Sequence, residues 1–272
     1  MTIKSILSAY SGDAAKGSGL RHALILAKHH DAWLTGVLRH GQSYMERTLR
    51  GKVPGELLET FFAAEKTRIN EVAERFESVA AEAGWGERSE FVDLNVEKGL
   101  SLSEYARPFD LIVTGVHSKN PDEYHMSANP DLIALRSGRP VLVIPDGYEA
   151  TGPAEHALVA WDGKRSSARA IGDAMPILEE KAKVTLLTVG SKEAPGTQIL
   201  MRNLARHGID ASLLLKPRQK AIARTILAAA QDVSAKMVVM GAFEHSKFSH
   251  DMFGGVTTDV IRDTDVPVFL SH

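Results

Sequence analysis

Short apolar runs alternate with longer amphipathic stretches along the chain, and the alternation is clearest in its second half. Apolar runs there predict strands over residues 156–161, 183–189, 211–216, 237–241 and 266–270. Stretches of mixed polarity between the runs predict helices over residues 166–180, 197–207, 220–233 and 256–263. Nearly continuous apolar strands that alternate with helices are typical of a parallel sheet buried on both faces, so the expected fold class is α/β.

The same order of elements occurs twice. In the first half, ILSAYSG (6–12) precedes a helical stretch that ends near His30, just as LVAWDG (158–163) precedes a helix in the second half. Ser11 therefore aligns with Asp162, and each is followed by a glycine. A recurring order of this kind indicates an internal repeat.

A linker separates the two copies. PDGYEATGP (145–153) clusters proline, glycine and polar residues between two apolar runs. Further along each copy, LIVTG (111–115) corresponds to VVMG (238–241). We therefore expect two tandem doubly wound domains, residues 1–146 and residues 153–272.

The first half is longer than the second, and one long helix accounts for most of the extra length. Its apolar positions recur every three to four residues and comprise Leu57, Leu58, Phe61, Phe62, Ile69, Val72, Phe76 and Val79. We expect this stripe to cover one face of the sheet. A stripe that also gathers a partner or a ligand is the alternative.

Composition narrows the class of protein. The chain has 272 residues, of which 44% are hydrophobic and 24% charged, with a net charge of -2 and no cysteine. Near-neutrality argues against a broad nucleic-acid surface, and the absence of cysteine excludes disulfides and thiolate chemistry. The apolar runs are shorter than the roughly 18 residues that span a bilayer. The expected location is the cytoplasm, with no membrane partner.

In an open parallel sheet, ligands bind beyond the carboxyl ends of the strands. In the second half, Asp162 and Gly163 follow the first predicted strand, and Val189 ends the second. A longer loop, from Gly241 to Thr257, follows the fourth strand. Within it, the glycine pair 254–255 precedes a helix whose free amide groups suit a phosphate. A plain turn would also use glycines there.

The spacing of Gly241, twelve intervening residues and Gly254, read with Asp162, resembles the nucleotide-binding universal stress proteins. That resemblance implies two fused family domains, each with a five-stranded parallel sheet of the adenine nucleotide alpha hydrolase-like fold. It assigns Asp162 to the adenine, the backbone of Val189 to the base, and the glycine loop to the phosphates. Gly241 and Gly254 match the first and third glycines of the family loop.

Two positions depart from the family pattern. Gly255 stands where a serine or threonine is expected and is followed by Val256 and Thr257, whose hydroxyl could replace the missing one. Glu244 stands where the second glycine is expected. A positive φ there would cost roughly 1–2 kcal/mol. A carboxylate about 4 Å from a phosphate would add roughly 1–4 kcal/mol of repulsion.

Nearby cations bear on this repulsion. Lys164, His245 and Lys247 lie close enough to the loop in the sequence to offset part of the Glu244 charge. The alternative is a weak site or one of AMP type.

The first-half copy departs further from the family. Ser11 replaces the aspartate, and the loop over residues 114–138 has Gly115 and then no glycine until Gly138. We expect this copy to be a scaffold or to bind a different ligand. The chain also lacks Walker-type, Gly-x-Gly-x-x-Gly and Gly-x-Ser-x-Gly motifs, so no catalytic residues are assigned.

No metal site is expected from the histidine spacing. The strand-end loops carry four histidines, which we interpret as solvated side chains: His117, His125, His245 and His250. We interpret His29 and His30 as a favourable interaction with the dipole at a helix carboxyl end.

The resulting hypothesis is a cytoplasmic universal stress protein that binds ATP, ADP or AMP in its C-terminal domain as a regulatory ligand in stress response, with Mg²⁺ accompanying ATP. At most it would hydrolyse ATP slowly. The alternatives are a nucleotide-independent scaffold with vestigial pockets, or a small-metabolite binder that uses the N-terminal pocket. Besides the nucleotide we expect a protein partner of unknown identity.

Family domains pair through their final strands, so the resemblance implies that residues 141–145 and 266–270 pair within one chain. The chain would then be a monomer with internal domain pairing or form a homodimer.

Overall fold

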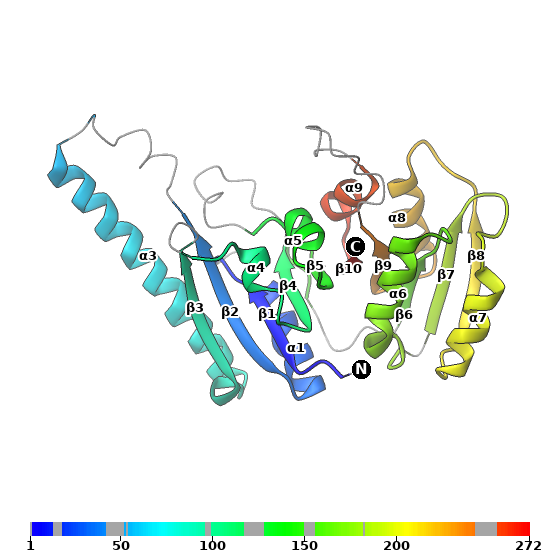
Figure 1. The fold of residues 1–272 in the computed structure, drawn as a ribbon, viewed down its shortest axis with the longest axis horizontal. Coiled ribbons are helices and arrows are strands. Elements are labelled where there is room, and N and C mark those ends of the chain that lie inside the picture. The colour runs from blue at the N-terminus through cyan, green and yellow to red at the C-terminus, as the bar shows by residue number, and fades with distance from the viewer. Residues whose placement is uncertain are drawn as a thin grey trace.

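The computed structural model describes residues 2–12, 18–41, 52, 54–95, 99–116, 128–149, 156–181, 183–242 and 255–272. Within these ranges, ten strands form one mostly parallel sheet with helices on both faces (Figure 1). The predicted α/β fold class is thus confirmed. Glu244, His245, Lys247 and Gly254 lie outside the described residues, as do His117, His125 and His250.

The N-terminal half contributes five strands in the spatial order β3-β2-β1-β4-β5. Their bounds are β1 (Ser5–Ala9), β2 (Trp33–His40), β3 (Ser89–Asn95), β4 (Leu111–Gly115) and β5 (Val141–Ile144). The connecting helices are α1 (Ser18–His30), α3 (Gly55–Glu82), α4 (Leu102–Tyr105) and α5 (Pro130–Arg136), with a 3₁₀ turn η1 at Gly86–Arg88. All pairings within this half are parallel.

The C-terminal half repeats this arrangement, with the spatial order β8-β7-β6-β9-β10 and only parallel pairings. Its strands are β6 (His156–Ala160), β7 (Lys183–Val189), β8 (Ala211–Lys216), β9 (Met237–Gly241) and β10 (Val268–Ser271). Its helices are α6 (Arg165–Leu178), α7 (Thr197–Arg206), α8 (Ile222–Asp232) and α9 (Val256–Asp263). The predicted elements are all present, with boundaries that shift by at most a few residues.

One antiparallel pairing joins the two halves. The last strands β5 and β10 lie side by side with Leu142 opposite Phe269, and these two side chains are each 1% exposed. The final strands of the two halves therefore pair within the chain, as the resemblance implied. The two five-stranded sheets form one continuous sheet of ten strands.

The core has two layers, one on each face of the sheet. One apolar cluster packs α1, α3, α6 and α7 against the strands. The other cluster packs α4, α5, α8 and α9 against the opposite face. Strands that are buried on both faces explain why their sequences are almost continuously apolar.

The long helix α3 is confirmed, but its apolar stripe is packed only toward its carboxyl end. Val72, Phe76 and Ala80 are buried there. Near the amino end, Leu57 is 57% exposed and Phe62 is 42% exposed. The prediction that the whole stripe covers the sheet is therefore wrong for the amino-terminal half of α3, because that part of the helix extends past the edge of the sheet (Figure 1).

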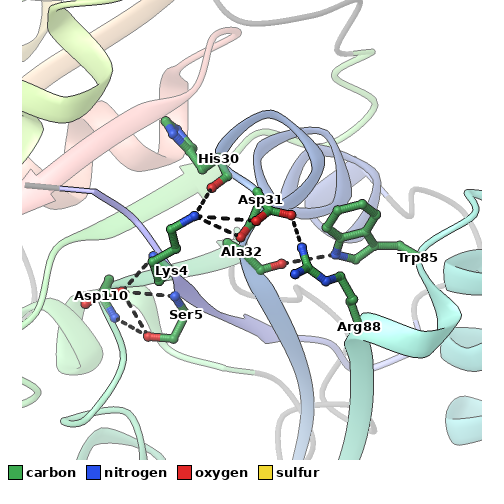
Figure 2. Close-up of polar contacts among 8 residues, drawn as sticks. All are labelled: Lys4, Ser5, His30, Asp31, Ala32, Trp85, Arg88 and Asp110. Carbon is green, nitrogen blue, oxygen red and sulfur yellow. Dashed lines mark hydrogen bonds and ion pairs between the residues drawn. The ribbon is translucent and has the colours of Figure 1, made fainter.

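A polar network anchors the end of α1 beside the amino ends of β1 and β2 (Figure 2). The Asp110 carboxylate accepts hydrogen bonds of 2.9 Å from the backbone N–H groups of Lys4 and Ser5. The Lys4 ammonium donates to the carbonyl oxygens of His30, at 3.2 Å, and Asp31, at 3.3 Å. The carboxyl end of α1 is thereby held in a defined position against the sheet.

No helix in the described part of the chain is long and apolar enough to cross a membrane.

Candidate functional site

Three of the predicted site residues converge at the carboxyl edge of the C-terminal sheet. The central strand β6 lies between β7 and β9, with Ala160 opposite Leu187 and Val159 opposite Val239. Asp162 follows Ala160 by two residues, and Val189 and Gly241 follow Leu187 and Val239 by two residues each. Since the strands are parallel, the three residues come to the same edge of the sheet.

Asp162 organises the turn between β6 and α6. Its Oδ1 accepts a hydrogen bond of 3.0 Å from the backbone N–H of Lys164 and one of 2.7 Å from the Ser167 hydroxyl. Its Oδ2 lies 3.8 Å from the Lys164 ammonium, and the Asp162 side chain is 51% exposed. One carboxylate oxygen is thus used in the turn, and the other faces outward beside a cation.

The backbone next to Asp162 is closely packed. Gly163 has a φ of +78°, and a β-carbon there would lie 2.8 Å from the carbonyl oxygen of Pro195. The Trp161 ring lies close to Gly196, and its indole nitrogen is buried with no hydrogen-bond partner among the described residues. Only glycine fits the left-handed backbone and the close approach at Gly163.

Gly241 has a packing role that its spacing did not reveal. A β-carbon at Gly241 would lie 2.5 Å from the carbonyl carbon of Ser166 and 2.6 Å from the amide nitrogen of Ser167. The first turn of α6 therefore rests directly on the end of β9. This contact brings the amino end of a 14-residue helix to the same edge as Asp162.

The amino end of α9 carries three more of the predicted site residues. Gly255 precedes the helix and is exposed, Val256 begins it, and Thr257 is 6% exposed. The helix is tied to the N-terminal half by a hydrogen bond of 3.3 Å from the Thr258 hydroxyl to Asp131. The rest of the glycine loop, including Glu244 and Gly254, lies outside the described residues.

In the corresponding turn of the N-terminal half, α3 covers Gly12. Gly12 has a φ of +75°, and a β-carbon there would lie 2.3 Å from a methyl group of Val72. Arg75 adds a hydrogen bond of 3.2 Å to the Gly12 carbonyl. In the strand register, Arg39 takes the place that Val189 has in the C-terminal half. Val72 and Arg75 of α3 thus cover the turn after β1 at Gly12, the position that corresponds to Gly163 in the C-terminal half.

Sequence reasoning missed several residues that shape this edge. Ser167 binds the predicted Asp162, and Ser166 contacts the predicted Gly241. The segment DGKRSS (162–167) has an aspartate followed by hydroxyl residues at a helix start, and this signal was available. The contact with Gly241 joins residues 75 positions apart, and no local pattern encodes it.

The described residues thus form two doubly wound α/β halves joined in one sheet, with Asp162, Val189 and Gly241 at one edge of the C-terminal half. Residues 153–272 match the model of the Universal stress protein family. The Universal stress protein Slr1230 of Synechocystis sp. is 26% identical over 177 residues, which is 61% of this chain and 59% of that protein. The chain therefore spans less than two thirds of the length of this curated relative.

Solved structures share the whole fold. A universal stress protein from Archaeoglobus fulgidus covers 98% of this chain and 95% of its own, with a TM-score of 0.71 and 14% identity. A protein from Pseudomonas aeruginosa UCBPP-PA14, described as a universal stress protein, covers 99% and 93%, with a TM-score of 0.57 and 17% identity. The C-terminal half, residues 153–272, thus matches the universal stress protein family in sequence, and the whole chain shares the fold of the solved universal stress protein structure.

Proposed function

We propose that the C-terminal half, residues 153–272, binds an adenine nucleotide as a regulatory ligand, and that the N-terminal half, residues 1–146, is a scaffold. The observation that supports this most directly is the meeting of Asp162, Val189 and Gly241 at one edge of the half that matches the family. The asymmetry between the halves is supported by a difference in what covers the turn: a side chain of α3, Val72, covers Gly12, whereas the loop residue Pro195 covers Gly163.

Each residue has a role in the proposed site. The outward Oδ2 of Asp162 accepts a hydrogen bond from the exocyclic amine of adenine, while Oδ1 holds the turn. The backbone beside Val189 contacts the base. The amides at Gly255, Val256 and Thr257 face the phosphates, because a helix amino end favours anions. Mg²⁺ would accompany ATP, and we assign no protein ligand to it.

Glu244 sets the expected preference among nucleotides. A carboxylate in the loop repels a triphosphate more than a monophosphate, so we expect AMP or ADP to bind at least as well as ATP. With no catalytic residue assigned, the ligand acts as a signal in stress response rather than as a substrate, and hydrolysis of ATP is at most slow.

Calorimetry with AMP, ADP and ATP tests the proposal. We expect one nucleotide to bind per chain. No heat from any of the three at millimolar concentration would contradict nucleotide binding altogether.

Replacement of Asp162 tests the assignment of the base. Asp162→Asn keeps an oxygen for Ser167 and Lys164 but can present an amide donor to the adenine amine. It should weaken binding by about 1.5–3 kcal/mol, or roughly 10- to 150-fold. Ser167→Ala is the matched control, because it removes only the local hydrogen bond and should change the affinity little. Equal affinity of Asp162→Asn and the original chain would refute the site.

A second candidate function is association through α3, for which we take a second copy of this chain as the partner. Leu57 is 57% exposed and Phe62 is 42% exposed on the part of α3 that extends past the sheet. Two such stripes can pair with each other about a two-fold axis. Light scattering should then detect a dimer that Phe62→Glu abolishes. A monomer at all concentrations would contradict this function and leave nucleotide binding unaffected.

A further inference from the structure

The carboxyl ends of α1 and α6 meet on the side of the sheet that carries both helices. The His29 Nε2 lies 2.7 Å from the Glu180 Oε2, and the His30 Nδ1 lies 3.8 Å from the Glu180 Oε1. The two imidazole rings are 5.0 Å apart between centroids, at an interplanar angle of 78°. His29 and Glu180 are 151 positions apart and belong to different halves of the chain.

His30 is the fixed member of this cluster. Its side chain is 8% exposed, and its Nε2 is buried with no hydrogen-bond partner among the described residues. Its carbonyl is held by the Lys4 ammonium, and Figure 2 shows the ring directed away from that contact. His29 and Glu180, with side chains 37% and 38% exposed, are free to adjust around it.

We propose that His29, His30 and Glu180 form a site for a divalent transition-metal cation of the Zn²⁺ class, which links the two halves. Two imidazoles and a carboxylate are ligands that Zn²⁺ prefers, and three protein ligands leave one position for water. One ligand atom from each residue already lies within 4.8 Å of the other two. The ends of α1 and α6 also contribute partial negative charge.

Binding requires only a small rearrangement. With bonds of roughly 2.0–2.2 Å, tetrahedral Zn²⁺ holds its ligand atoms roughly 3.4 Å apart. The His29–Glu180 hydrogen bond must open slightly, and the Glu180 carboxylate must come closer to His30. Rotation of the two exposed side chains can achieve both movements, so the backbone ends of α1 and α6 can stay in place.

The positive charge of Lys181 repels a cation bound at this site. Lys181 therefore offers a test in which the affinity for the cation should rise. It follows Glu180 directly, and its positive charge acts on the His30 ring. Lys181→Met should therefore tighten Zn²⁺ binding, because it removes a nearby like charge. A substitution that improves binding cannot be explained by partial unfolding.

Calorimetric titration of the full-length, untagged protein with ZnCl₂ tests the site, and the absorption bands of Co²⁺ report its geometry. We expect binding in which His29→Ala and Glu180→Gln each lower the affinity at least about tenfold, since even outer-sphere changes cost that much. Zn²⁺ should also raise the melting temperature of the original chain but not of these variants.

His207→Ala is the matched control. The His207 Nδ1 lies 2.8 Å from the Glu179 Oε1, which makes an exposed histidine–glutamate pair next to the proposed site but without a second histidine. Its loss should leave the affinity unchanged. The site is refuted if Zn²⁺ does not bind at millimolar concentration, or if His29→Ala and Glu180→Gln have no more effect than His207→Ala.

Discussion

Individual glycines determine how closely the backbone segments of the candidate site approach one another. Gly241 admits the first turn of α6 onto the end of β9, and Gly163 admits Pro195. In the other half, Gly12 admits Val72. Each glycine therefore permits a close contact with a different kind of neighbour: a helix backbone at Gly241, a loop proline at Gly163 and a helix side chain at Gly12.

Gly241→Ala should destabilise the protein by about 1–3 kcal/mol, because its β-carbon would meet the backbone of Ser166 rather than a movable side chain. Urea unfolding measures this free energy. Gly172→Ala is a useful comparison, since Gly172 lies within α6 with nothing near its would-be β-carbon. That change should raise the stability by about 0.5–1 kcal/mol. Equal effects of the two substitutions would show that the contact with Ser166 is not limiting.

His22 should make stability depend on pH. Burial, with a smaller contribution from Lys181, lowers the pKa of His22 from 6.5 to about 4. Because the unfolded chain takes up the proton more readily, stability is full above pH 6.5 and is lost as the pH falls toward 4. The loss should reach roughly 2–3 kcal/mol near pH 4.5.

Urea unfolding at pH 7 and pH 4.5 measures this loss. His22→Leu keeps an apolar side chain beside Tyr148, whose ring centroid lies 5.9 Å from that of His22, and it should reduce the pH dependence. An unchanged dependence in the variant would assign the effect to other groups.

Among the helices, α3 combines two different environments. Its carboxyl-terminal part packs Phe76 against Gly36 of β2 and against Phe91 of β3, with 5.4 Å between the two ring centroids. Its amino-terminal part presents Leu57 and Phe62 to solvent. One continuous apolar stripe therefore serves the core at one end and is available for association at the other.

Substitutions along α3 should separate these roles. Phe76→Ala removes a fully buried ring and should cost about 3–5 kcal/mol of unfolding free energy. Phe62→Ala, on the same helix but exposed, should change it by less than about 0.5 kcal/mol. Urea unfolding measures both values, and a large loss for Phe62→Ala would mean that this end of α3 is packed in solution.

The continuous sheet joins the two halves through one shared junction. The antiparallel contact of β5 with β10 buries Leu142 and Phe269, and the polar contact of Thr258 with Asp131 lies next to it. A substitution that weakens this junction should therefore lower the unfolding free energy of both halves.

Phe269→Ala should destabilise both halves together by about 3–5 kcal/mol. Trp33 and Trp85 report on the N-terminal half, and Trp161 reports on the C-terminal half. One sample carries Trp161→Phe, so that only the N-terminal half fluoresces, and the other carries Trp33→Phe and Trp85→Phe, so that only the C-terminal half does. The urea unfolding midpoints of the two samples should coincide. Midpoints that separate would show that the halves unfold independently.

The sequence predicted local features well and long-range contacts poorly. Strands such as Met237–Gly241 and helices such as Val256–Asp263 were found because their patterns are local. The division of α3 into a packed and an exposed part was missed, since the same spacing of apolar residues encodes both. The predicted site residues Asp162, Val189 and Gly241 do share one edge.

The partners of the predicted residues were not accessible in the same way. From the sequence, His29 and His30 were interpreted only as residues at a helix carboxyl end. The contact with Glu180 forms only in the folded chain. Likewise, the covering of Gly12 by Val72 depends on where α3 crosses the sheet. Such contacts join residues far apart in the chain, and no spacing rule encodes them.

The covering of Gly12 by α3, with a nucleotide site proposed only in the other half, also has a consequence for how the protein would respond to its ligand. Two identical sites facing each other across a symmetric sheet could be coupled, so that saturation would be steep or stepwise. Within one chain, the proposed site of the C-terminal half has no second proposed nucleotide site to couple with. The binding curve of the proposed nucleotide site should therefore be a simple hyperbola. Occupancy would then rise gradually with nucleotide concentration, without a threshold.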